Sequence, residues 1–235
     1  MAIRDALFLL ADVWMITVGF TFGWKFIRNY GNYLLGLEWI IVATSGSNFL
    51  VYALLGGDET SPMYTAAHFL DAFSRSVGIT LILVMGLMGA THRYKPSKAT
   101  DVGVFAFAAA VGLFLQLFGE RLGLALDIFY VVVNVLTTLF LIYFSKRLWA
   151  IGAKGMAIGA GLATAAAFTI AATYDFVRIP GDDAAHTLFY IAALSTWGFQ
   201  MCMYYFAYRA LHAHNESAEA EPERREQSPV AGAGA

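Results

Sequence analysis

The chain has 235 residues, of which 59% are hydrophobic and 14% are charged, and its formal net charge at pH 7 is −2. A soluble domain usually carries about a quarter charged residues, so this composition is typical of a membrane protein and excludes nucleic acid as a partner. The single cysteine, Cys202, cannot form an intramolecular disulfide. We expect neither a metal centre nor another cofactor.

Long apolar segments follow one another along the chain, each close to the roughly 20 residues that span a bilayer. The predicted spans are residues 6–24, 33–55, 63–90, 101–118, 122–144, 155–174 and 187–211. Their short connections favour neighbouring antiparallel helices. The predicted fold is therefore all-α, a polytopic seven-helix bundle over residues 1–211. Residues 212–235 are charged and lack large apolar side chains, which predicts a disordered tail.

The charges of the connecting loops alternate in sign along the chain. Basic residues gather at 25–28, 92–98 and 146–154, whereas the other three loops carry Asp58, Glu59, Glu120, Asp175, Asp182 and Asp183. Because positively charged loops stay cytoplasmic, this pattern predicts an exterior N-terminus and a cytoplasmic C-terminus. We expect a multi-pass protein of the cell membrane, specifically a bacterial inner membrane. The N-terminal stretch indicates a first span and not a removable signal.

The sixth span is rich in small residues. Gly155, Gly159 and Ala163 recur four residues apart, and such spacing lets helix backbones approach closely in lipid. We expect close packing within the bundle, with a homo-oligomer interface as the alternative.

Polar side chains inside predicted spans are costly and usually face a cavity or a partner. All the ionisable ones except Glu38 fall in the outer half of the predicted bundle. The ionisable residues are Asp12, Glu38, His68, Asp71, Arg75 and Asp127, and the neutral ones are Asn48, Tyr52, Asn134 and Gln200.

The third span combines three of these residues on one helical face. His68, Asp71 and Arg75 follow i, i+3, i+7 spacing, so Asp71 and Arg75 can pair directly, with Asp127 or Asp12 as further acceptors. The pair either locks helices together or serves a ligand or a proton. The neutral polar residues either bind the ligand or join helices. Candidate catalytic acids are Asp71, Asp127 and Asp12, and candidate ligand-binding residues are His68, Arg75, Asn48, Tyr52, Asn134 and Gln200.

The length and topology are similar to those of microbial rhodopsins, and PMYTAAHFLDAFSR resembles the third helix of that family loosely. That family binds retinal through a lysine in its last span. All lysines of this chain lie in or beside the predicted cytoplasmic loops, so a retinal Schiff base cannot form. The remaining hypothesis within this resemblance is a sensory or binding protein that carries no retinal. The lysines are Lys25, Lys95, Lys98, Lys146 and Lys154.

The chain also resembles the small seven-span integral-membrane terpene cyclases. The resemblance lies in a basic loop at Arg28, in SGSNFLVY with Asn48, and in NVLTTLFLIYFSKR followed by GAKGMAIG. It implies acid-catalysed terpenoid cyclisation. The acids of that family would fall near Val51–Tyr52 and Met203, where this chain has none, so Asp71, Asp127 or Asp12 would have to donate the proton.

These observations predict a protein that binds a small lipophilic ligand in an outward-facing polar pocket, with terpenoid cyclisation as its chemistry. The alternatives are a small-molecule or proton-coupled transporter and the retinal-free binding protein. The expected partners are membrane lipid, the lipophilic ligand and, as an alternative to a monomer, a second copy of the chain.

Overall fold

The computed structural model describes residues 3–58 and 60–227. This part of the chain folds into seven long helices and contains no strand, which confirms the all-α prediction. The third long helix is built from three consecutive segments, α3, η1 and α4. The helices are α1 Ile3–Tyr30, α2 Tyr33–Leu54, α3 Pro62–Phe73, η1 Ser74–Ile82, α4 Leu83–Thr91, α5 Lys98–Leu122, α6 Leu124–Ala150, α7 Lys154–Thr173 and α8 Thr187–Gln227.

The first six of these long helices are long and apolar enough to cross a membrane, by length and composition. The apolar half of α8 is interrupted by polar residues such as Gln200 and by several tyrosines. Large apolar side chains also cover the outside of the bundle, a surface that soluble monomers rarely present and that suits contact with lipid. Examples are Phe107, Leu113, Phe114, Leu117, Leu136, Leu139 and Leu162, each at least half exposed.

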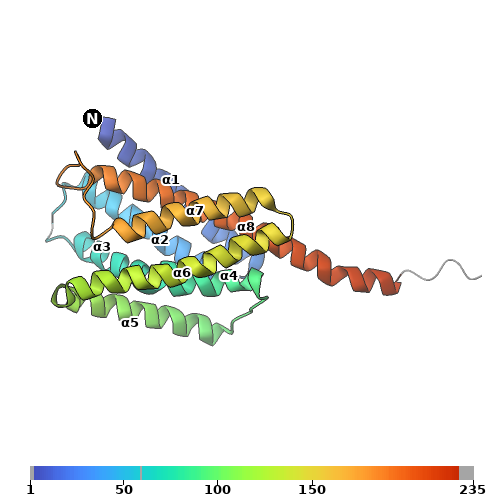
Figure 1. The fold of residues 1–235 in the computed structure, drawn as a ribbon. Helices are drawn as coiled ribbons and strands as arrows, with labels where there is room; N and C mark the ends of the chain where they lie inside the picture. Colours follow the sequence, from blue (N-terminus) through green and yellow to red (C-terminus); the bar gives the residue numbers. More distant parts are fainter. Residues whose placement is uncertain (1–2, 59, 228–235) are drawn as a thin grey trace, which may run out of the picture.

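Successive helices run in opposite directions, so the connections gather at two ends of the bundle (Figure 1). We name these ends by their charge. The basic end holds the α1–α2, α4–α5 and α6–α7 connections, with Lys25, Arg28, Lys98, Lys146 and Lys154 in or beside them. The acidic end holds the α2–α3, α5–α6 and α7–α8 connections, with Asp58, Glu120, Asp175, Asp182 and Asp183.

Glycines allow α1 and α2 to approach each other closely. A Cβ atom added to Gly23 would lie 2.8 Å from the backbone oxygen of Gly36, so only glycine fits there. Close packing of α7 inside the bundle also occurs, because Ala160 and Ala163 are fully buried. Gly155, by contrast, has open space beside it.

The middle of the third long helix is π-helical over Ser74–Ile82. The hydroxyls of Ser76 and Thr80 donate to the backbone oxygens of Ala72 and Ser76, at 2.6 and 2.7 Å. Such widened helical turns are frequent at functional sites. Hydropathy alone did not predict this segment, because the hydropathy of a span does not distinguish π-helical turns from α-helical ones.

The prediction of a disordered segment from residue 212 is wrong as far as residue 227, because α8 continues to Gln227 and projects beyond the basic end (Figure 1). Two contacts dock the start of this extension. Asn215 donates to the backbone oxygen of Ala90 at 2.7 Å, and Arg93 pairs with Glu219 at 3.0 Å. Alanine, glutamate and arginine also have high helix propensity. The part of the prediction that concerns residues 228–235 lies outside the described residues.

Candidate functional site

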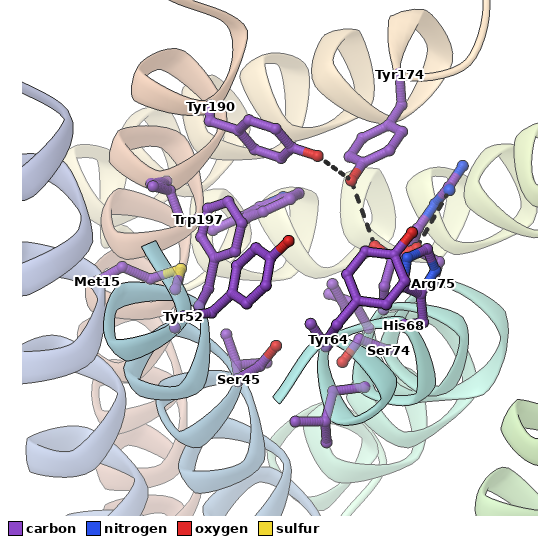
Figure 2. Close-up of a pocket in the computed structure, with 18 residues that line it drawn as sticks. Met15, Ser45, Tyr52, Tyr64, His68, Ser74, Arg75, Tyr174, Tyr190 and Trp197 are labelled. Atoms are coloured by element: carbon purple, nitrogen blue, oxygen red, sulfur yellow. Dashed lines mark hydrogen bonds and ion pairs between the residues drawn. The ribbon is translucent and has the colours of Figure 1, made fainter. Parts of the chain in front are cut away.

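A cavity of about 400 Å³ lies between α1, α2, α3, η1 and α8 (Figure 2). We call it the main pocket. The rim of this pocket is formed by residues at helix ends. Tyr52, Tyr64 and Tyr190 belong to the terminal turns of α2, α3 and α8, and Tyr174 follows α7. These turns all belong to the acidic end. The main pocket therefore occupies that half of the bundle, where most of the polar residues were predicted.

An ion cluster forms one side of the main pocket. Arg75 of η1 pairs with Asp71 of α3, with 3.5 Å between Nη1 and Oδ2, and its Nη2 pairs with Asp175 of the α7–α8 connection. The guanidinium carbon lies 4.0 Å from the ring centre of Tyr130 and 4.1 Å from that of Tyr174. The predicted Asp71–Arg75 pair is thus present. The further acceptor is Asp175, and not Asp127 or Asp12 as predicted.

Asp71 is the carboxylate of this cluster that faces the main pocket. Its side chain is 42% exposed, compared with 14% for Arg75. The hydroxyl of Tyr174 donates to its Oδ1 at 3.4 Å, and the hydroxyl of Tyr190 lies 3.4 Å from that of Tyr174 (Figure 2). Both bonds to Asp71 are long, so its oxygens retain capacity to accept a shorter hydrogen bond.

The opposite side of the main pocket is apolar and aromatic. Phe49, Trp197, Met15 and Leu194 line it. Most ligand pockets have such a composition, an apolar lining with a few polar groups that orient the ligand.

Of three further residues predicted to bind the ligand, His68 and Tyr52 line the main pocket and Asn48 does not. His68 lies edge-on to Tyr64, with ring centres 4.3 Å apart. Tyr52 lines the main pocket and donates to the backbone oxygen of Gly57 at 2.9 Å. Asn48 instead donates to the backbone oxygen of Met63 at 2.9 Å, so it joins α2 to α3, the interhelical role considered as the alternative.

Asp12 and Asp127 do not line the main pocket. Asp12 is fully buried behind its wall, with Oδ1 only 2.9 Å from where a Cβ of Gly46 would lie. Asp127 is half-buried in the first turn of α6. Neither carboxylate faces the space that a ligand would fill.

Two small cavities continue from the main pocket toward the basic end. The first, of about 40 Å³, is lined by Asn134, Gln200, Arg75 and Tyr174, and we call it the threonine cavity because Thr80, Thr137 and Thr164 also line it. The second, of about 20 Å³, holds Gln200 and Glu38, and we call it the glutamate cavity. Asn134 donates to the backbone oxygen of Tyr130 at 2.9 Å, within its own helix.

Sequence reasoning missed several residues of the site. The sequence predicts Asp175 only as a loop charge and Tyr174 only as the end of a span. Tyr64 and Tyr190 were not singled out. Their aromatic character was a signal, but no periodicity fixes which face of a helix turns toward a cavity.

No protein-family model, curated protein or solved structure matches this chain. The fold and the site alone therefore define its class. It is a seven-helix bundle of membrane-spanning character with an internal pocket that is charged on one side and aromatic on the other.

Proposed function

We propose that this chain is a multi-pass protein of the cell membrane that binds a small lipophilic ligand in the main pocket. One observation carries the proposal. The cavity of about 400 Å³ has an apolar aromatic wall and, among its described lining residues, one accessible carboxylate, that of Asp71. Pockets for small organic ligands typically measure about 300–1,000 Å³. The smaller cavities beyond Ile79 and Trp197, of about 40 and 20 Å³, favour binding over an open passage in this conformation.

The charges of the ion cluster indicate the chemistry of the ligand's head group. Arg75 is already paired with two carboxylates and stacked on two rings, so it has little affinity left for an anion. Asp71 still offers acceptor capacity to the cavity. We therefore propose a ligand whose head donates a hydrogen bond, a hydroxyl or an ammonium group, and whose apolar body lies along Phe49 and Trp197.

The orientation follows from the positive-inside rule. The basic end would face the cytoplasm, and the main pocket would then open toward the outside. Fusions of a cytoplasm-active reporter after Lys98 or Arg209 should give signal, whereas a periplasm-active reporter should give signal after Asp58. A periplasmic signal from a fusion after Lys98 would reverse the orientation.

Substitution of Asp71 tests the ligand site directly. Asp71→Asn keeps the shape of the side chain but removes the charge, so we expect the purified protein to lose most of its co-purified ligand, measured by mass spectrometry of organic extracts. Asp127→Asn is the matched control, because this carboxylate lies at the same end of the bundle but outside the main pocket. Equal ligand content in the two variants, both with wild-type melting temperatures, would contradict the proposal.

A second candidate function, acid-catalysed cyclisation of a terpenoid, is supported by one further feature. Asp71 shares the cavity with the aromatic side chains of Phe49, Tyr52, Tyr64 and Trp197. Aromatic faces stabilise cations such as the carbocation formed when an acid protonates an alkene or epoxide. Incubation with a polyprenyl epoxide, followed by product analysis, tests this chemistry. Cyclic product should form with wild type and Asp127→Asn and be absent with Asp71→Asn.

A further inference from the structure

Glu38 is a buried carboxyl group that the ligand site does not use. It lies on α2 with 1% of its surface exposed, and in the described part of the chain neither carboxyl oxygen has a hydrogen-bond partner. Burying an unpaired charge is very costly, and even an unpaired neutral polar group loses a hydrogen bond. A carboxyl group kept in such a place calls for a specific explanation.

The surroundings of Glu38 are shaped to hold it. Its carboxyl group lies over Gly78 in the π-helical segment η1, and a Cβ atom on that glycine would come within 2.9 Å of the carboxyl carbon. Glu38 also lines the glutamate cavity of about 20 Å³. A cavity needs roughly 10–15 Å³ to hold a water molecule, so there is room beside Glu38 for one.

The groups that face Glu38 offer it no charge. They come from α2, from η1 and α4, and from α8, and among the described lining residues the titratable one is Tyr204. Its hydroxyl lies 2.8 Å from that of Thr164 and accepts from Gln200 at 3.3 Å. The residues lining the glutamate cavity beside Glu38 are Trp39, Val42, Ile79, Leu83, Trp197, Gln200, Met201 and Tyr204.

Polar groups connect the glutamate cavity to the main pocket. Gln200 is the polar side chain that lines both small cavities, together with the apolar side chains of Ile79 and Trp197. Arg75 and Tyr174 line both the threonine cavity and the main pocket. At the basic end, in contrast, the side chains of Phe26 and Leu35 are fully buried in the apolar core.

We propose that Glu38 is a proton-binding site that exchanges its proton with the main pocket through water in the two small cavities. The carboxyl proton passes to the water beside it, and from there past Gln200 to water in the threonine cavity. The carboxylate left behind takes up a proton by the reverse route. A ligand that fills the main pocket closes this route, so occupancy of the pocket controls the exchange.

Infrared spectroscopy of the purified full-length protein tests the site without knowledge of the ligand. Wild type should show the carbonyl-stretch band of a protonated carboxylic acid at neutral pH, and the band should shift when H₂O is replaced by D₂O. Glu38→Gln should lose this component, and Glu38→Asp should move it, which keeps the assignment testable if the first variant does not fold. Asp12→Asn replaces another fully buried carboxyl group and should leave the component in place.

Gln200→Leu tests the route, because it replaces the polar side chain between the cavities with an apolar one. The band should remain, and its shift in D₂O should become slower than in wild type. A band unchanged by both Glu38 substitutions would overturn the assignment to Glu38. A wild-type band that resists D₂O, or a Gln200→Leu variant that exchanges as fast as wild type, would overturn the route.

Discussion

Replacement of Arg75 by alanine is expected to lower the free energy of unfolding by about 3–5 kcal/mol, the cost of removing one partner of a buried ion pair. The change leaves Asp71 and Asp175 without their shared cation and also removes the stacking of the guanidinium on Tyr130 and Tyr174. Thermal unfolding of the detergent-solubilised protein measures the loss. Arg121→Ala is the control, because Arg121 is exposed at the end of α5, and such substitutions usually change stability by within about 0.5 kcal/mol.

Compensating variants separate a structural role of this cluster from a ligand-binding role. Arg75→Met with Asp71→Leu should restore only part of the stability, because Asp175 remains charged. Addition of Asp175→Leu should restore most of it, since apolar residues can often replace a buried ion pair. If Asp71 also binds the ligand, the triple variant should be stable but should contain no co-purified ligand. An Arg75→Ala variant that melts like wild type would contradict the buried cluster.

The helices could be predicted from hydropathy because each one had to be long and apolar. Their ends could not. The sequence predicts a loop at Lys25 and Arg28, yet both belong to the last turns of α1, because a long basic side chain can extend past the end of an apolar helix into water. The charge of the tail predicts disorder, but Asn215 finds a partner in the last turn of α4 and Glu219 finds one in the α4–α5 connection.

The candidate site was predictable only where its residues share one helix. Asp71 and Arg75 lie four residues apart, so helical geometry alone brought them together. Asp175 lies 100 residues further along the chain, and only the tertiary fold returns its connection to η1. Asp127 was a reasonable alternative acceptor by depth, but the rotation of α6 about its axis, which hydropathy does not fix, leaves it outside the main pocket.

A substitution in the apolar core at the basic end should destabilise the protein as much as a substitution in the ion cluster. Phe26 is fully buried and meets Trp39, Tyr205 and Tyr208 edge-on, with ring centres 4.6, 5.2 and 5.1 Å apart. Phe26→Ala would leave a cavity among these rings, and we expect it to lower the free energy of unfolding by about 3–5 kcal/mol, as large-to-small core substitutions do. Thermal unfolding in detergent measures the change.

Phe20→Ala is the matched control, because Phe20 lies on the same helix with 41% of its surface exposed and leaves no enclosed cavity when truncated. The same pair of variants tests whether the apolar core blocks proton exchange between Glu38 and the basic end, so that Glu38 exchanges only with the main pocket. Loss of the Phe26 ring should open the packing between Glu38 and the basic end, so the acid band of Glu38 should shift faster in D₂O in Phe26→Ala than in Phe20→Ala. Equal melting temperatures in the two variants would contradict the stabilising role of the Phe26 ring, and equal shift rates in D₂O would mean that the ring cluster does not seal this end of the bundle.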